Sequence, residues 1–175
     1  MPGSSSHLIA RFFDVLLTRP LGLSEVDAVV HWLEPPLAAI FFEQPPEDQR
    51  HGYHAALVVV SEGSNSSEVV EAALMHDVGK RHSHLGIVGR SVASVMIRLG
   101  LPLSPRFVQY RDHGQIAARE LAEAGASRLS VEFATNHHGS RPPSFDTATW
   151  TLLLKADQPP NPRSLINVGI TSTVE

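Results

Sequence analysis

The most informative segment of the chain is residues 67–80, SEVVEAALMHDVGK. Its apolar residues recur at the spacing of one helix face: Val69, Val70, Ala73 and Leu74. This pattern predicts a helix over residues 67–76, and Gly79 is expected to end it. The pair His76-Asp77 therefore stands at the inner end of a buried helix, where a carboxylate is costly unless a positive charge neutralises it.

A divalent metal ion is a positive charge that suits this pair. Aspartate offers a hard oxygen ligand and imidazole a borderline nitrogen ligand, a combination typical of Mn, Fe, Co, Ni or Zn sites and, with fewer histidines, of Mg. The alternative is a His-Asp pair that makes only capping and surface contacts at a helix end. Residue types alone leave both interpretations open.

Helical patterns continue on both sides of this segment. We predict further helices over residues 7–17, 24–33, 36–42, 45–60, 88–99, 105–110, 114–124, 130–137 and 147–157. Ser24, with Asp27 three residues on, is a predicted N-cap, and residues 81–86 are a predicted loop. Residues 58–60, three valines in a row at the end of a helix pattern, are assigned to that helix because a lone strand would have nothing to pair with. The sequence therefore predicts an all-α fold. The first helix carries apolar residues on one broad face: Leu8, Ile9, Phe12, Phe13, Leu16 and Leu17.

Composition limits the classes of function. The chain has 175 residues, 42% of them hydrophobic, which suits one globular domain with its own core. It has no cysteine, which excludes disulfides, thiolate metal sites and a cysteine nucleophile. The net charge of -4 indicates no basic face, so nucleic acid is not an expected partner. No apolar run approaches the roughly 20 residues that cross a bilayer. Residues 1–6 lack the pattern of a secretory signal, so we expect a cytoplasmic protein.

Histidine is the unusual residue, with ten copies, and histidines and acids gather in four clusters. The clusters are Arg50-His51 with His54, His76-Asp77 with Lys80, Asp112-His113, and His137-His138 with Asp157 further on. His51 and His54 lie three residues apart and share a helix face. The neighbours His137 and His138 would point about 100° apart on a helix, so one of them would normally point away from any single metal ion.

The order of these clusters resembles the HD superfamily of metal-dependent phosphohydrolases. Residues 72–80 are similar to that family's ALLHDIGK, residues 50–51 to its RH, and residues 113–118 to the HPEIGA of its two-metal members. Residues 137–138 resemble their HH, and residues 155–157 the closing KAAD or VADA. The resemblance covers about residues 47–158. An ordered set of five motifs is far more specific than the His-Asp pair alone. Two features depart from known subfamilies: Gly114 stands where proline is usual, and the GYP word of cyclic-di-GMP phosphodiesterases is absent.

The resemblance implies a compact helical bundle over residues 46–158, with N-terminal helices in residues 1–45 packing on it and a proline-rich tail at 159–175. It implies four ligands of a first metal ion: His51, His76, Asp77 and Asp157. It implies three residues that recruit a second: His113, His137 and His138. Asp77 would bridge the ions and orient the nucleophile, and Lys80 would face the scissile phosphate. Arg90 is a further candidate for binding the substrate's charge. His54 remains a rival of His51, because His51 lies closer to His76 in sequence than is usual in the family.

We therefore predict a metal-dependent phosphohydrolase that uses one or two divalent ions (Mn, Fe, Mg, Co, Ni or Zn). Its expected substrate is a phosphoester of a nucleotide or of another small phosphorylated compound. The alternative is a non-catalytic regulatory HD module that binds metal or nucleotide. The proline-rich tail keeps that alternative open, together with a homo-oligomer in which the tail contacts a partner subunit.

Overall fold

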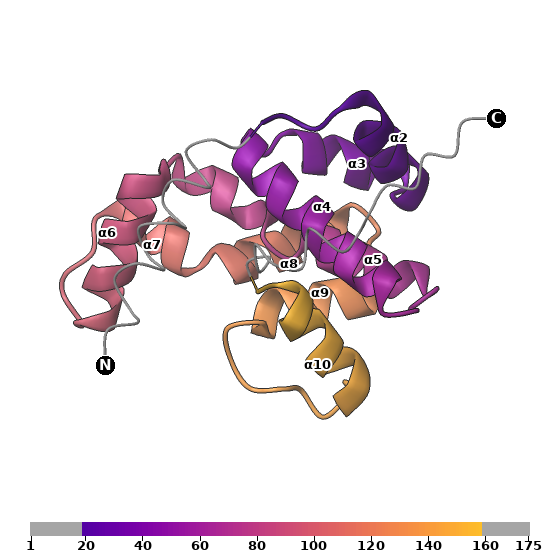
Figure 1. Ribbon diagram of the computed structural model, residues 1–175. Helices are drawn as coiled ribbons and strands as arrows, with labels where there is room; N and C mark the ends of the chain where they lie inside the picture. Colours follow the sequence, from indigo (N-terminus) through magenta and orange to yellow (C-terminus); the bar gives the residue numbers. More distant parts are fainter. Residues whose placement is uncertain (1–18, 159–175) are drawn as a thin grey trace, which may run out of the picture.

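The computed structural model describes residues 19–158, and this part of the chain contains helices and no strand (Figure 1). The predicted all-α fold is confirmed. The elements are α2 (Leu23–Trp32), α3 (Pro35–Phe42), α4 (Pro46–Ser61), α5 (Ser67–Met75), the 3₁₀ helix η1 (Val78–Ser83), α6 (Ile87–Arg98), α7 (Pro105–Arg111), α8 (His113–Glu123), α9 (Arg128–Asn136) and α10 (Thr147–Ala156). None of these helices is long and apolar enough to span a membrane. The predicted helix over residues 7–17 and the predicted tail at 159–175 lie outside the described residues.

The predicted helix boundaries agree with the structure to within one or two residues, but the predicted N-cap at Ser24 is wrong. Helix α2 begins at Leu23, and Gly22 is its N-cap. The Glu25 carboxylate accepts the backbone N–H of Gly22 at 2.7 Å. The acid of the capping box is therefore Glu25 and not Asp27, because only Glu25 stands three residues after the true cap.

The loop predicted over residues 81–86 is wrong in its first half, which belongs to η1. Side chains hold these tight turns: Arg81 Nη1 donates to the Val78 carbonyl at 2.8 Å, and Ser83 Oγ donates to the Lys80 carbonyl at 2.7 Å. Such local side-chain bonds leave no periodic apolar pattern, so a 3₁₀ turn of this kind looks irregular in sequence.

The core is built around α5, which packs against α4, α9 and α10 and also contacts α2 and α3 (Figure 1). Its last four residues, 72–75, are almost completely buried. Phe133 of α9 packs edge-on against Trp150 of α10, with ring centroids 5.5 Å apart. Each large apolar side chain buried in this way contributes on the order of 1.5–3 kcal/mol. The C-terminal end of α5, where His76 follows, is thereby fixed inside the protein.

Two glycines let the elements around that end approach each other closely. A Cβ added to Gly79 would lie 2.0 Å from the His113 carbonyl oxygen, so only glycine allows η1 to lie so close to α8. A Cβ added to Gly114 would lie 2.4 Å from the carbonyl oxygen of Ala134 in α9. The sequence interpretation of Gly79 as a helix terminator is therefore wrong. Helix α5 has already ended at Met75, and Gly79 is needed for packing within η1.

Candidate metal centre

The candidate ligands sit mostly at the ends of helices. His76 is the C-cap of α5, His137 of α9 and Asp157 of α10. His113 is the first residue of α8, and only His51, in α4, comes from the middle of a helix. Because several helix ends converge here, short side chains from distant parts of the sequence reach one point.

Asp77 is the centre of this arrangement, and it is only 3% exposed. Its Oδ2 lies 3.6 Å from His51 Nε2 and 3.5 Å from His76 Nε2. These two imidazoles also approach Asp157 Oδ1, at 3.2 Å and 3.0 Å. The four side chains form one group whose candidate ligand atoms all lie within 4.8 Å of one another.

The other carboxylate oxygen of Asp77 belongs to a second group. Its Oδ1 lies 3.2 Å from His113 Nε2 and 3.5 Å from His137 Nε2. His138 completes the group, with its Nε2 3.2 Å from that of His113. Adjacent residues on a helix would diverge, but α9 ends at Asn136, so both His137 and His138 reach this side of Asp77. The expectation that one of the two points away is therefore wrong.

Three of the imidazoles are oriented by a backbone carbonyl three residues earlier. The Nδ1–H groups of His76, His113 and His137 donate to carbonyl oxygens at 2.9, 2.6 and 2.9 Å. The acceptors are the carbonyls of Ala73, Tyr110 and Ala134. A carbonyl can only accept, so in each neutral ring the proton is on Nδ1 and the Nε2 lone pair faces the carboxylate oxygens of the centre. Metal-binding histidines are typically oriented by an outer hydrogen bond of this kind.

Two buried atoms in this centre have no hydrogen-bond partner among residues 19–158: Asp77 Oδ1 and His137 Nε2. Buried polar atoms without partners are rare and costly, and these two lone-pair donors face each other. A divalent cation would satisfy both at once. Nitrogen and oxygen donors without sulfur are the ligand types that suit Mn, Fe, Co, Ni or Zn. The buried His/Asp groups could therefore hold metal ions.

Charges around Asp77 favour its ionised form. Burial alone raises the pKa of the Asp77 carboxyl, but the Lys80 ammonium and the neighbouring His76 hold it well below its usual range. Lys80 Nζ donates to Asp77 Oδ2. Burial alone lowers the pKa of Lys80, but the Asp77 charge outweighs this and raises it. Both groups are therefore charged near neutral pH, and this carboxylate is ready to bind a cation.

The pKa values of Asp157 and His138 also favour the protonation states that bind a cation. Burial alone raises the pKa of Asp157, but the imidazoles of His51 and His76 beside its Oδ1 bring it far below its ordinary value. Burial, with His137 and His113 nearby, lowers the pKa of His138 to about 4. His138 is therefore neutral at pH 7, which is the state in which an imidazole binds a metal ion.

The structure places all seven predicted ligands in these two groups and leaves out their rival, His54. His54 lies beside Tyr53, with ring centroids 6.4 Å apart. Burial and the charge of Arg50 lower its pKa. Of the three further histidines in the described residues, His82 bonds to Glu120 at 2.6 Å, and His31 and His84 are exposed. Position in the fold, and not residue type, separates the candidate ligands from these histidines.

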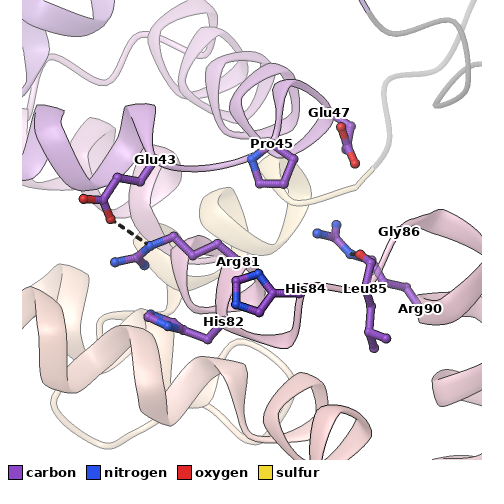
Figure 2. A pocket seen from close by; sticks show the side chains of 9 residues that line it. All are labelled: Glu43, Pro45, Glu47, Arg81, His82, His84, Leu85, Gly86 and Arg90. Atoms are coloured by element: carbon purple, nitrogen blue, oxygen red, sulfur yellow. Dashed lines mark hydrogen bonds and ion pairs between the residues drawn. The ribbon is translucent and has the colours of Figure 1, made fainter.

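Arg90, predicted to bind substrate, lines a pocket of about 550 Å³ between η1 and the starts of α4 and α6 (Figure 2). Its guanidinium forms a bidentate pair with the buried carboxylate of Asp48, at 2.5 and 2.6 Å, and also donates to the Leu85 carbonyl at 2.9 Å. Sequence reasoning missed Asp48, which looks like an ordinary acid in the first turn of a helix. Three of the N–H groups of Arg90 are thus committed to the fold.

A smaller hollow, of about 90 Å³, opens beside the second group of ligands. His137 and His138 line it together with Arg111 and Asp112, which bond to each other at 2.7 Å. The hollow therefore lies on the side of the centre formed by His137 and His138.

Comparisons of the chain with protein-family models, with curated proteins and with solved structures each found no match. The resemblance to the HD superfamily therefore rests on the ordered sequence motifs alone, and the family assignment stays a prediction.

Proposed function

We propose that this protein is a metal-dependent phosphohydrolase of the HD type. The observation that carries the proposal is the position of Asp77, whose two carboxylate oxygens face two separate His/Asp groups. A carboxylate shared by two groups is the arrangement expected of a site that clamps a phosphate between two cations. We infer that the substrate is a phosphoester of a nucleotide or of another small phosphorylated compound.

Two sets of residues in this chain have separate roles as ligands. His51, His76 and Asp157 would hold one cation with Asp77, and His113, His137 and His138 would hold a second with the same carboxylate. Divalent cations in such a site lower the pKa of water towards 7 and neutralise phosphate oxygens. In the hydrolysis, the water oxygen forms a new bond to phosphorus, the ester P–O bond breaks, and the leaving alcohol takes up a proton.

Lys80 is the residue proposed to act on the phosphate. Its side chain bonds to Asp77 Oδ2 and keeps 18% of its surface exposed, so its ammonium can reach a ligand at the edge of the centre. A fixed cation at this point stabilises the negative charge that builds up on the phosphate oxygens as the bond breaks, and removal of one such group typically costs about 10²–10³ in rate.

The test is phosphate ester hydrolysis by the full chain, depleted of metal and then supplied with Mn²⁺. The probes are p-nitrophenyl phosphate, its bis ester and a panel of nucleoside monophosphates. We expect Mn²⁺-dependent turnover that is lost in His113→Ala and falls about 100-fold in Lys80→Ala. The matched control is Lys155→Ala, which removes an exposed lysine whose ammonium donates to Glu62, at 2.8 Å, and should leave the rate unchanged.

Two results would overturn the proposal. If the protein binds metal tightly but hydrolyses none of these esters, the non-catalytic regulatory module becomes the better interpretation. If the rate in Lys80→Ala equals that of the control, Lys80 does not contact the phosphate.

A further inference from the structure

The pocket of about 550 Å³ between η1 and the starts of α4 and α6 lies outside the metal centre (Figure 2). None of the seven candidate ligands lines it. Small-molecule sites typically have volumes of roughly 300–1,000 Å³, and this pocket falls within that range. It is therefore large enough for a whole small molecule and not only for a single phosphate group.

The cationic side chains of the pocket are paired with acids of the protein. Arg81 donates to Glu120 at 2.8 Å, and His82 lies 2.6 Å from the same carboxylate. Arg90 binds both carboxylate oxygens of Asp48. Because carboxylates already neutralise these side chains, the pocket is a poor site for a second phosphate group.

Two polar side chains of the pocket have no hydrogen-bond partner among residues 19–158: Glu47 and His84. A carboxylate only accepts hydrogen bonds, whereas an imidazole can donate one and accept one. Pro45 and Leu85 add apolar surface to the lining. A ligand that suits this lining has hydroxyl groups for the carboxylate and a partly apolar body with a polar edge for the imidazole.

His84 is held in a backbone conformation that favours glycine. Its φ is 48°, and among residues 19–158 it is the only residue other than glycine with a positive φ. Arg106 of α7 fixes this turn by donating to the carbonyl of Ser83, at 3.0 Å, and to that of His84. Glycine would adopt the turn with less strain, so the imidazole is kept against a local preference. Strained residues that the surrounding fold holds in place gather at ligand-binding sites.

The pocket adjoins the metal centre on two of its walls. Glu47 and His51 of α4 are four positions apart, so they share a helix face and are separated by about 6 Å along the axis. In η1, Lys80, which bonds to Asp77, directly precedes the pocket residue Arg81. The separation along α4 is close to the width of a sugar ring, so a sugar can join a phosphate at the centre to a group in the pocket.

We propose that this pocket holds the nucleoside part of a nucleotide substrate, an inference that rests on the phosphohydrolase function proposed above. The phosphate lies at the Asp77 centre, and the ribose hydroxyls donate to the Glu47 carboxylate, whose two oxygens can accept both. The base packs against Pro45 and Leu85, and its edge bonds to His84. A phosphorylated sugar without a base would leave the imidazole and the apolar wall unused, so a nucleotide fits the lining better.

The first test measures binding without turnover. Isothermal titration calorimetry of the metal-depleted full chain compares the 5′-monophosphates of adenosine, guanosine, cytidine and uridine with ribose 5-phosphate, which has no base. We expect at least one nucleotide to bind at least about tenfold more tightly than ribose 5-phosphate. Its affinity should fall about tenfold in Glu47→Gln and about fivefold in His84→Gly, the usual effects of losing a hydrogen bond to a charged and to a neutral group.

Controls separate these effects from damage to the fold. Glu68→Gln matches Glu47→Gln, because Glu68 is also the second residue of its helix but does not line the pocket. This variant should bind like the wild type. His84→Gly removes the imidazole and keeps the turn, since glycine adopts a positive φ readily, so its melting temperature should stay close to that of the wild type.

The outcomes distinguish this inference from the proposed function. Equal affinity for the nucleotides and ribose 5-phosphate, or unchanged affinity in both pocket variants, would overturn the nucleoside pocket. If the protein hydrolyses p-nitrophenyl phosphate with Mn²⁺ but prefers no nucleotide, the pocket assignment is wrong and the phosphohydrolase stands. If a nucleotide binds through Glu47 and His84 but no ester is hydrolysed, the nucleoside pocket stands and the phosphohydrolase is wrong.

Discussion

The substitution Asp77→Asn separates a shared metal ligand from an ordinary buried acid. It keeps the shape of the side chain and removes the one carboxylate that belongs to both His/Asp groups. We expect the wild type to bind close to two divalent ions per chain and the variant to bind fewer than one. The reason is that each group loses its central anionic ligand while the amide donor cannot replace it.

The expected size of the effect follows from linkage. Metal ion at 100 times its dissociation constant stabilises the folded state by about 2.7 kcal/mol. For a chain of this length each kcal/mol raises the melting temperature by roughly 2–4 °C, so each Mn²⁺ ion bound to the wild type should add about 5–11 °C. In Asp77→Asn the gain should be under about 2 °C. The metal-free variant should itself melt lower than the metal-free wild type, since Lys80 loses the carboxylate to which it bonds.

The assay is thermal unfolding by circular dichroism, with and without Mn²⁺, combined with elemental analysis of the dialysed protein. The control is Asp112→Asn, because this acid also neighbours His113 but bonds to Arg111 and belongs to neither group. It should keep both the metal content and the gain in melting temperature. An equal gain in Asp77→Asn and the wild type would refute the assignment of Asp77 as the shared ligand.

Three further predictions test the structure around the centre. The stability of the metal-free protein should fall as pH decreases from about 6.5 to about 4, because the low pKa of His138 means that only the unfolded chain takes up this proton; urea titrations across this range measure the effect. Gly79→Ala should lower stability by about 2 kcal/mol or more and reduce metal content, because its Cβ would meet the backbone of α8. Gly86→Ala, whose Cβ would have no atom of the described residues within 4 Å, should change the urea midpoint little. Asp48→Ala should destabilise the fold by roughly 3–5 kcal/mol in the same titration, because Arg90 would keep its buried charge without a partner, and a loss below about 1 kcal/mol would contradict this.

The helices and the set of candidate ligands could be predicted because both leave local signals. Apolar spacing indicated α5, and the ordered His and Asp motifs selected the residues that the fold brings together. The Asp48–Arg90 pair could not be found in this way, since its partners are 42 positions apart and each has an ordinary local role. The same holds for Gly79, whose need for glycine comes from the His113 carbonyl of another helix. Local apolar spacing does not indicate contacts of this kind between separate helices.

The hydrogen bonds that orient two of the imidazoles did leave a signal in the sequence. His76 and His137 each stand at the end of a helix, and each donates Nδ1–H to the carbonyl three residues before it. A helix leaves its last carbonyls without partners inside the helix, so a histidine at the C-cap can use one of them to fix its own ring. The position of these histidines relative to the helix ends therefore predicts their orientation as well as their place.

The helix ends also explain why this point of the fold favours cations. Helices α5, α9 and α10 all end at a candidate ligand, namely His76, His137 and Asp157. Each helix C-terminus carries a partial negative charge of roughly half a unit, and each such end stabilises a nearby cation by about 0.3–1 kcal/mol. An acid at the end of a helix, such as Asp157, is unfavourable by the same rule, and a bound cation would remove that cost. The converging helix ends, the two carboxylates and the oriented imidazoles thus all favour a bound cation. Without metal, the centre keeps a negative charge that metal binding would neutralise.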